Sequence, residues 1–264
     1  MTFDVKVYRQ TFRDISSSND RSNLIKVIPL YIYENLPSTN QKLWELIDRN
    51  SKVSSGVIAL RQTAGKGQWG KQWLSPAGGM YLSVSLFPDL ALNDNFHLVM
   101  ATAWGIATTL RSYDVPVAIK WSNDLILSGR KLGGIKIETR ASRKRITQAV
   151  VGVGINWINT VPEVGINLLS YRDRLSSLEQ LVAIATYGIL FGYQHYLKVG
   201  VEKLIANYLE LLITLGQQVT VEGEKGTVTG VTTEGKLIVK VERSPSTATE
   251  VYLTPGQISL GYEF

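Results

Sequence analysis

A glycine-rich segment that lies between two strand-like stretches constrains the fold more than any other part of the sequence. Gly65, Gly67 and Gly70 have the G-x-G-x-x-G spacing of dinucleotide-binding folds. In those folds a helix begins directly after the glycines, because its N-terminus holds the pyrophosphate. Here Pro76 and two further glycines follow instead, and the next stretch, residues 80–87, has the period-two pattern of a strand. The segment is therefore predicted to be a loop between two strands, and a dinucleotide-binding turn is excluded.

The same segment contains most of a P-loop, the phosphate-binding loop of many nucleotide-binding proteins. Gly65 is followed at the right distance by Gly70 and Lys71, but Gln72 stands where a P-loop needs Ser or Thr to hold magnesium. Because no helix follows either, we reject the P-loop as well. The glycine amides and the charges of Lys66 and Lys71 favour a flexible flap that closes over an anion. A solvated surface loop is the simpler alternative.

Hydrophobic periodicity along the chain predicts a main domain of the α+β class followed by a small β domain. Expected strands cover residues 24–33, 57–60, 80–87, 117–121, 133–139 and 147–155, and expected helices begin at residue 38 and cover 96–113, 176–198 and 201–212. Short alternating stretches separated by turn residues fill the chain after residue 216. We therefore predict a main domain over 1–215, in which 1–22 are a poorly patterned lead-in, and a β-barrel-like domain over 216–264.

The composition excludes several kinds of chemistry. The chain has 264 residues, no cysteine and only two histidines, which excludes disulfides, thiol nucleophiles, iron–sulfur clusters and a multi-histidine metal site. A net charge of +6 favours anionic ligands or an acidic partner. No apolar run follows the charged first twenty residues, and the most hydrophobic stretch, residues 181–197, is too short for a comfortable membrane span. We expect a cytoplasmic protein that does not bind membranes.

A second segment rich in charge follows the expected strand 117–121. Lys120 and Lys131 flank a turn that contains Asn123 and Asp124. A lysine at the start of a strand beside two glycines could reach inward to an anionic ligand, and Asp124 could orient a lysine or assist a magnesium ion through water. A β-hairpin with charged ends is the structural alternative.

Five short motifs in this chain resemble, in the same order, those of the biotin–protein ligase family. They are Ser38-Thr39-Asn40, the glycine loop from Gly65 to Pro76, Lys120 to Asp124, Lys131 to Glu138, and Gly152 to Asn156. In the last of them, two glycines inside a strand pattern indicate close approach of a backbone or a ligand, or else a β-bulge. Each motif alone is weakly specific, but five in order over about residues 36 to 156 are highly specific.

The glycine loop departs from the family pattern, which is usually written G-R-G-R-x-G-R-x-W-x-S-P. Lys66, Gln68 and Lys71 stand where the family has arginine, and Ser122 replaces the proline of the family's K-W-P-N-D. Lysine keeps the charge but loses the two-pronged geometry of arginine, and Gln68 removes a charge altogether. In the family this loop holds the reactive intermediate, so Gln68 bears on how tightly the intermediate is retained.

The resemblance implies a two-step ligase. The family joins biotin to ATP, giving biotinyl-5′-AMP and pyrophosphate, and then transfers biotin to a lysine on the carrier protein or carrier domain of a biotin-dependent carboxylase such as acetyl-CoA carboxylase. The resemblance also implies Mg²⁺ with the ATP, a mixed-sheet catalytic domain over 1–215 and an SH3-like domain over 216–264. It further implies a single-function member, because the lead-in has no room for a helix-turn-helix domain.

By the same resemblance, Lys131 lies between the biotin carboxylate and the α-phosphate and, with Lys66 on the flap, supplies the catalytic positive charge. The residues expected to contact biotin are Ser38, Thr39, Asn40, Gln62, Gly65, Lys66, Gly67, Gln68, Lys131 and Gly134. Those expected to contact ATP are Lys71, Trp73, Asn123, Asp124, Lys131 and Asn156. No metal ligand is certain, and Asp124 and Asn156 are expected as indirect magnesium contacts. Ser38 could equally be a plain helix N-cap, and Trp73 an ordinary core residue.

Two other interpretations stay open. A lipoate–protein ligase resembles this family, but its R-R-x-x-G-G-G-x-V-x-H-D stretch is absent from the chain. A basic nucleic-acid-binding protein without catalysis would suit the net charge, but the aromatic residues of the terminal domain do not alternate with basic ones. We expect biotin, ATP and a carrier protein as partners, expect no nucleic acid, and leave a homodimer open. The basic stretch from Arg140 to Arg145 is expected to be a solvated hairpin tip, or else to steer an acidic carrier domain.

Overall fold

The computed structural model describes residues 3–19, 25–49, 53–244, 247–258 and 260, and these residues contain a large mixed sheet of eight strands. Its strands are β1 (Leu30–Leu36), β2 (Gly56–Gln62), β3 (Met80–Leu86), β4 (Leu90–Ala91), β5 (Ala118–Lys120), β6 (Asp124–Leu127), β7 (Arg130–Ser142) and β8 (Arg145–Ile155). The order is β1-β2-β3-β8-β7-β6-β5, and β4 pairs with β8. β1 and β2 run parallel, while the other neighbouring pairs are antiparallel. The predicted α+β class with a mixed sheet is confirmed.

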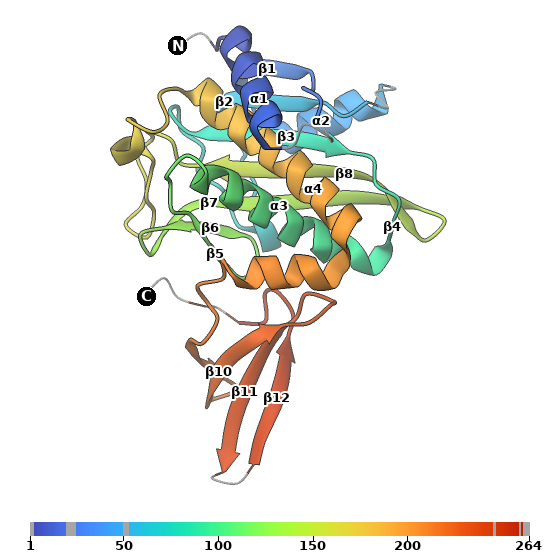
Figure 1. The fold of residues 1–264 in the computed structure, drawn as a ribbon, viewed down its shortest axis with the longest axis vertical. Coiled ribbons are helices and arrows are strands. Elements are labelled where there is room, and N and C mark those ends of the chain that lie inside the picture. The colour runs from blue at the N-terminus through green and yellow to red at the C-terminus, as the bar shows by residue number, and fades with distance from the viewer. Residues whose placement is uncertain (1–2, 20–24, 50–52, 245–246, 259, 261–264) are drawn as a thin grey trace.

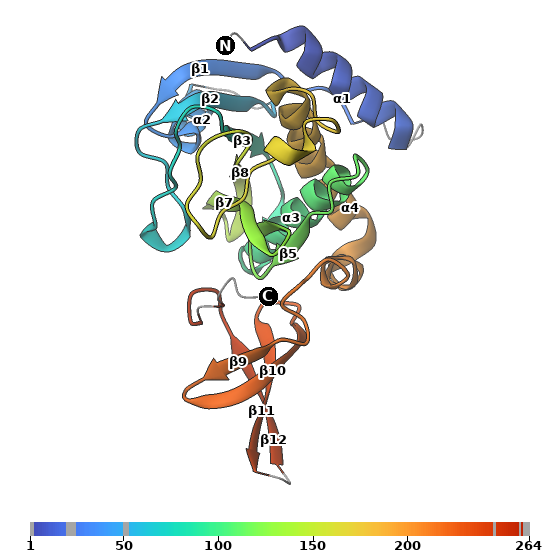
Figure 2. The same ribbon diagram turned by 90° about the vertical axis from the view of Figure 1, so that its left-hand side faces the viewer.

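Helices cover the two faces of this sheet unequally. α1 (Val5–Asn19), α3 (Asn95–Arg111) and α4 (Leu178–Leu209) lie together on one face, and α2 (Thr39–Asp48) lies on the other (Figures 1 and 2). The alternation of β2 explains this, because Ile58 belongs to the large core under α3 and α4. Val57 and Ala59 point the other way and pack with Leu43 and Ile47 of α2. Part of the second face is thus left for other segments.

The prediction of a poorly patterned lead-in over 1–22 is wrong for its described part, since Val5–Asn19 form α1. Tyr8, Phe12 and Ile15 recur at helical spacing and are buried. The Phe12 ring meets that of Tyr187 in α4 edge-on, with 5.7 Å between the ring centroids. The pattern was missed because only a narrow apolar stripe runs through an otherwise polar segment.

Most other elements agree with the predicted ones apart from their ends. β1 covers Leu30–Leu36 where 24–33 was predicted, and residue 24 lies outside the described residues. The two helices predicted at 176–198 and 201–212 run together as α4, with a kink at Gly200, whose φ is +79°. The short strand β6 was not predicted. Among the described residues, no helix combines the length and the apolar character needed to cross a bilayer.

A smaller antiparallel sheet follows at the C-terminal end of the chain. It contains β9 (Gln218–Val221), β10 (Glu224–Val231), β11 (Leu237–Ser244) and β12 (Thr247–Leu253) in the order β12-β11-β10-β9. The sheet starts two residues after the boundary predicted at 216, and its four strands are consistent with an SH3-like domain. It lies beyond the last turns of α4, at the bottom of Figure 1.

The turn between β10 and β11 joins the small sheet to the large one. Trp121 Nε1 donates a hydrogen bond of 3.2 Å to the carbonyl oxygen of Gly235, and His97 Nε2 lies 2.6 Å from the carbonyl oxygen of Thr233. A Cβ atom placed on Gly235 would lie only 1.8 Å from the Phe96 ring, so the turn packs tightly against the start of α3. The two sheets are therefore held in contact beside the segment that follows β5.

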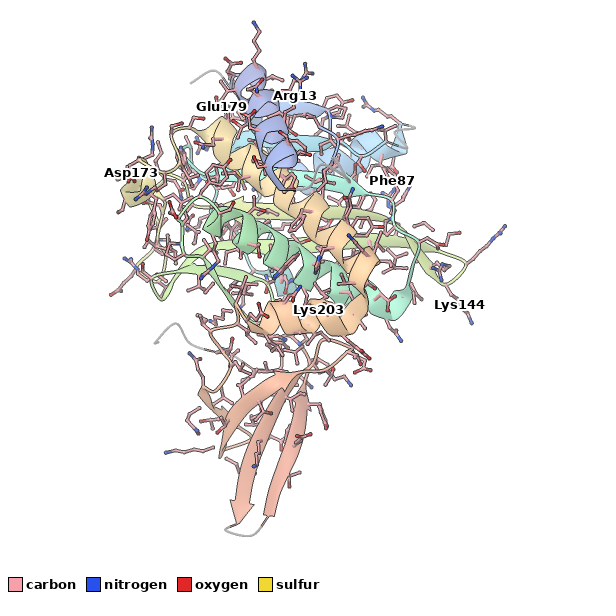
Figure 3. All side chains as sticks on the ribbon, in the orientation of Figure 1. Arg13, Phe87, Lys144, Asp173, Glu179 and Lys203 are labelled. Atoms are coloured by element: carbon pink, nitrogen blue, oxygen red, sulfur yellow. The ribbon has the colours of Figure 1, made fainter. Side chains whose placement is uncertain are left out.

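The predicted hairpin tip is the turn between β7 and β8. Arg140 pairs with Asp48, and Arg145 pairs with Asp89, so the two arginines flank the tip rather than form it. Lys144 lies at the end of the hairpin and points away from the body of the molecule (Figure 3). The prediction of a solvated tip is confirmed, and steering of a partner stays a prediction.

Candidate active site

A cavity of about 460 Å³ opens on the face of the large sheet that α3 and α4 do not cover. The loop between β2 and β3 lies over this face, on the side opposite these helices (Figure 2). The cavity lining includes every predicted site residue except Gly65: Ser38, Thr39, Asn40, Gln62, Lys66, Gly67, Gln68, Lys71, Trp73, Asn123, Asp124, Lys131, Gly134 and Asn156. Motifs that span about 120 residues of sequence therefore meet in one space.

One end of the cavity is a network of neutral polar side chains. The backbone N–H and the hydroxyl of Thr39 both donate to Oε1 of Gln62, at 2.9 and 3.1 Å. This fixes the amide of Gln62 with its NH₂ group toward Ser75, whose Oγ lies 2.9 Å from Nε2. The hydroxyl of Ser83 lies 2.8 Å from Thr39 Oγ1 and 2.6 Å from Asn40 Oδ1. Such an arrangement suits a neutral ligand group with both donors and acceptors.

Ser83 was missed by the sequence analysis, and the alternative role of Ser38 is not supported. Ser83 lies on β3 with Tyr81 on the face opposite Leu82, and it is fully buried. The period-two pattern of β3 gave its direction but not its neighbours. Ser38 has the extended backbone of an N-cap before α2, but its side chain makes no capping hydrogen bond. Its hydroxyl therefore remains available to the cavity, whose lining it joins.

Two glycines in β8 make room for side chains rather than for another backbone. A Cβ atom on Gly152 would lie 2.3 Å from Asn40 Oδ1, and one on Gly154 would lie 2.4 Å from Trp73 Nε1. The pairing of β8 with β7 has no register shift at these residues, so a bulge is not the reason for them. A Cβ atom on Gly134, which pairs with Gly154, would lie 3.5 Å from the Trp73 ring. Trp73 thus lies over adjacent glycines of two strands, as a wall of the cavity.

The charged end of the cavity begins at Lys131. Its Nζ lies 2.7 Å from Oδ1 of Asp124 and 5.5 Å from the centre of the Trp73 ring. The Lys131 side chain is 25% exposed and that of Asp124 is 14% exposed, so the pair is accessible from the cavity but shielded from bulk solvent. The backbone N–H of Lys131 donates to the carbonyl oxygen of Val164, which fixes the start of β7. The predicted pairing of a carboxylate with a strand-start lysine is confirmed.

Lys120 is a third cation of this site, which the sequence analysis noticed without assigning it a role. It is only 4% exposed and lies opposite Asp124 in the pairing of β5 with β6. Burial, together with the nearby ammonium groups of Lys131 and Lys71, lowers the pKa of Lys120 to about 8, against the opposing effect of Asp124. Lys71, Lys120 and Lys131 therefore share one end of the cavity, and burying the charge of Lys120 costs desolvation free energy.

Hydrogen bonds to the surrounding elements hold the turn after β5 in place. Tyr208 of α4 donates its hydroxyl to the carbonyl oxygen of Ser122, at 3.0 Å. The backbone N–H of Trp121 donates to Thr214 Oγ1, at 3.1 Å. Asn123 Nδ2 donates to the carbonyl oxygen of Ile135, at 2.8 Å. Asn123 thus positions the turn against β7.

Asn156 is similarly engaged with its own surroundings. Its Nδ2 lies 3.1 Å from the carbonyl oxygen of Ile166, and its Oδ1 accepts a hydrogen bond from Asn159. Its amide therefore ties the end of β8 to the loop that follows. Contact of Asn156 with ATP or magnesium stays a prediction.

The glycine loop is folded on itself above the charged end. Gly67 N–H donates to the carbonyl oxygen of Lys71, and Trp73 N–H donates to that of Gly65. A Cβ atom on Gly65 would lie 2.5 Å from the carbonyl oxygen of Trp73, which explains why this position is glycine. Gly65 lies behind the wall of the cavity and does not line it. Lys66 and Lys71 are both exposed and line the cavity. Gln68 Nε2 lies 3.3 Å from the carbonyl oxygen of Ile135 and anchors the loop over β7.

Residues of the C-terminal end of the chain also line the cavity, and no sequence motif indicated them. They are Pro255, Gly256, Ile258 and Leu260. A Cβ atom on Gly256 would lie 3.2 Å from the indole of Trp69, which is itself 69% exposed. The tip of the glycine loop therefore lies against the segment that follows β12.

Glu138, which ends the motif from Lys131 to Glu138, has a structural role. It accepts a hydrogen bond of 2.9 Å from Trp44 Nε1 and pairs with Lys136 at 3.1 Å. Burial alone would raise the pKa of Glu138, but the hydrogen bonds from Trp44 and Lys136 outweigh it and hold the pKa below its usual value. Glu138 thus ties α2 to β7.

Comparisons with known proteins agree with this geometry. Residues 32–156 match the model of the Biotin/lipoate A/B protein ligase family. The chain is 32% identical over 135 residues to the bifunctional ligase/repressor BirA of Bacillus subtilis (strain 168), an overlap that covers 50% of this chain and 41% of that protein. It is 26% identical over 261 residues to the biotin–protein ligase of Homo sapiens, covering 91% of this chain and 34% of that one. The chain therefore spans less than half the length of the first of these relatives.

Solved structures show the same fold. The biotin protein ligase of Aquifex aeolicus, in complex with biotin and ATP, superposes with a TM-score of 0.67 at 22% sequence identity, covering 84% of this chain and 95% of that chain. The biotin protein ligase of Leishmania major, in complex with biotinyl-5-AMP, superposes with a TM-score of 0.56 at 18% identity, covering 87% of this chain. At these identities the likeness concerns the fold alone.

Proposed function

We propose that this chain, whose residues 32–156 match the model of the biotin/lipoate A/B protein ligase family, is an ATP-dependent biotin–protein ligase. It would activate biotin as biotinyl-5′-AMP and transfer it to a lysine of the carrier domain of a biotin-dependent carboxylase. A relative from Paracoccus denitrificans, 32% identical over 42% of this chain, is named biotin–[acetyl-CoA-carboxylase] ligase, which favours that carboxylase.

One observation carries the proposal, namely that the cavity is divided into a neutral polar end and a cationic end with Lys131 and Asp124 where they meet. Thr39 and Gln62 form the neutral end, and the lysines gather at the other. Biotin has a neutral ureido ring and an anionic carboxylate, and ATP is anionic throughout its phosphates. The cavity has the polarity that these two molecules require when they lie end to end.

The first step needs positive charge between two anions. A biotin carboxylate oxygen attacks the α-phosphorus of ATP, forming an O–P bond, and pyrophosphate leaves with the electron pair of the broken P–O bond. Two like charges at 4 Å repel by about 4 kcal/mol at an effective dielectric of 20. The ammonium of Lys131, oriented by Asp124, would offset this repulsion at the junction, and Lys66 would add charge from the loop.

The second step transfers the acyl group. The neutral amine of a carrier lysine attacks the carbonyl carbon of the mixed anhydride, a C–N bond forms, and AMP leaves with the electrons of the C–O bond. The amine must lose its proton, and the carboxylate of Asp124 is a candidate to receive it, directly or through water. The cations that hold the phosphates also stabilise the departing AMP.

Magnesium would enter this site with the triphosphate. Within the described ranges, no three His, Asp or Glu side chains gather closely enough to hold a metal ion by themselves. Mg²⁺ commonly binds through one or two carboxylates together with phosphates and water, and Asp124 fits that modest role. When bound, the ion would neutralise phosphate charge.

The test is direct. The protein is incubated with biotin, ATP, Mg²⁺ and an unbiotinylated carrier domain, and biotin-dependent exchange of pyrophosphate into ATP is measured together with biotin attached to the carrier. We expect both signals with biotin and neither with lipoate. Exchange with lipoate but not biotin would favour the other branch of the family, and stabilisation by an oligonucleotide alone would contradict the proposal.

A further inference from the structure

Large apolar side chains lie exposed at the mouth of the cavity. Leu74 is 62% exposed and Val164 is 49% exposed, and both line the cavity. They come from different segments, since Leu74 follows the tip of the glycine loop and Val164 lies in residues 160–165 between β8 and α4. Exposed apolar residues gathered beside a binding cavity are typical of a surface that a partner covers.

A second hollow, of about 450 Å³, adjoins this mouth on the outer side of the glycine loop. Val161 and Pro162 line it from one segment and Leu74 from the other. Leu74 and Pro162 also line the main cavity, so these two side chains lie where the two hollows meet. A partner seated in the outer hollow would therefore contact the entrance of the main cavity.

The charges around this mouth favour an acidic partner. Arg61, Lys66 and Lys71 are exposed, and residues 61–76 contain no aspartate or glutamate. Residues 160–165 contribute one carboxylate, that of Glu163. A surface with three cations and one anion attracts a partner of opposite charge and speeds its association.

We propose that Leu74, Val161, Pro162 and Val164 form the docking surface for the carrier domain. The partner is an acidic protein surface around the lysine that is to be modified, with apolar side chains that fill the outer hollow. This inference rests on the proposed function, because only a ligase that transfers biotin to a protein needs such a surface. The lysine would enter the main cavity between Leu74 and Pro162, while the acidic groups face Arg61 and the loop lysines.

A fluorescent label tests docking without requiring activity. The chain has no cysteine, so Leu74→Cys can be labelled at that one position with an environment-sensitive fluorophore. Leu197→Cys is the matched control, because Leu197 is 55% exposed but lies on α4 and lines neither hollow. On titration with an unbiotinylated carrier domain, we expect a saturable emission change at position 74 and none at 197. No change at 74, equal changes at both positions, or a change at 74 with duplex oligonucleotide instead of the carrier would overturn the proposal.

A kinetic test separates docking from chemistry. Val161→Ser should raise the KM for the carrier domain by about tenfold, the scale expected for losing one well-packed contact. Biotin-dependent pyrophosphate exchange, which needs no carrier, should remain at the wild-type rate. Leu197→Ser should change neither. An unchanged carrier KM in Val161→Ser would contradict the docking surface. Val161 is chosen here because it lines the outer hollow but not the main cavity.

A charge reversal completes the set. Arg61→Glu should slow carrier association by about tenfold at low salt and by much less at high salt, because exposed charges are screened. Arg13→Glu, on the outer face of α1 in Figure 3, changes the net charge equally and should have little effect. Equal effects of the two variants would show that net charge alone, and not this surface, attracts the carrier. Absence of exchange in the wild-type protein would overturn the proposed function, whereas the label decides docking on its own.

Discussion

The lysines of the site belong to two regions with opposite physical properties. Lys120 and Lys131 are carried by the strands β5 and β7, and Lys120 is almost fully buried. Lys66 and Lys71 are carried by the glycine loop and are exposed. Charge on the sheet is fixed in position but expensive to desolvate, whereas charge on the loop keeps its hydration until something displaces the water. If the proposed function holds, we expect the sheet to orient the reacting groups and the loop to close over them.

Removing the fixed charge should have the largest effect. Lys131→Ala is expected to lower biotin-dependent pyrophosphate exchange by about 10³-fold, at the upper end for loss of one electrostatic catalyst. Lys131→Arg, which keeps the charge with a different geometry, should lie between it and the wild type. Circular dichroism and thermal unfolding serve as controls for folding. Wild-type exchange in Lys131→Ala would refute both the role of this lysine and the division between the two regions.

Removing a loop charge should have a smaller effect, which should appear in how long the protein retains biotinyl-5′-AMP. Lys66→Ala is expected to release biotinyl-5′-AMP about 10²-fold faster, because the exposed ammonium acts only when the loop covers the anion. Lys144→Ala, at the tip of the β7–β8 hairpin in Figure 3, is the control with the same change in charge. Release is followed by rapid filtration. If Lys66→Ala lost exchange as completely as Lys131→Ala, the loop and the sheet would not differ in role.

Protease sensitivity tests the expected motion of the loop. Trypsin cuts after lysine, and Lys66 and Lys71 both lie exposed in the loop. We expect biotin with ATP to slow cleavage at these two lysines by about tenfold, because closure reduces the population of the open loop. Cleavage after Lys144 provides the internal reference. Equal rates with and without ligands would mean that the loop does not close.

The buried lysine should give the smallest effect, visible in its dependence on pH. Burial lowers the pKa of Lys120 from 10.5 to about 8, so its positive charge is lost as pH rises through about 8. The KM for ATP should then rise severalfold between pH 7 and 9, and Lys120→Met should remove that dependence. Profiles that coincide for the two proteins would show that Lys120 does not serve ATP.

Lys120 should also affect stability, and in the opposite direction: raising the pH should weaken ATP binding but increase the free energy of unfolding. Between about pH 8 and 10.5 the unfolded chain holds the Lys120 proton and the folded chain does not, so this group makes the free energy of unfolding rise with pH in that window. Below about pH 8 its full penalty applies. Lys120→Met should therefore melt a few degrees higher at pH 7. A lower melting temperature would show that the charge stabilises the fold.

The sequence predicted the site better than it predicted the elements that complete it. Thr39, Gln62 and Lys131 could be placed together because the chain resembles the biotin–protein ligase family in five ordered motifs, and that resemblance implies a shared site. The contact between Trp69 and Gly256 could not be predicted, because it joins residues nearly 190 positions apart without any shared pattern. Ser83 could not be predicted for a related reason. The period-two pattern of β3 shows which face of the sheet Ser83 points to, but not that Thr39 lies there as its hydrogen-bond partner.

Short or weakly apolar elements were the other source of error. α1 was missed because Tyr8, Phe12 and Ile15 make only a narrow stripe, whose partner surface on α4 cannot be seen locally. β6 has four residues and is a strand mainly because β5 and β7 hold it on both sides. In both cases tertiary packing, and not local propensity, decided the structure.

The contacts between the two sheets use main-chain oxygen atoms of the small sheet, and this bears on how its sequence can vary. Trp121 and His97 reach the carbonyl groups of Gly235 and Thr233, which every substitution leaves in place. At Gly235 an added Cβ atom would collide with the Phe96 ring, so this position is restricted to glycine. The two hydrogen bonds therefore place no demand on the side chain at position 233, whereas the contact between the sheets requires glycine at position 235.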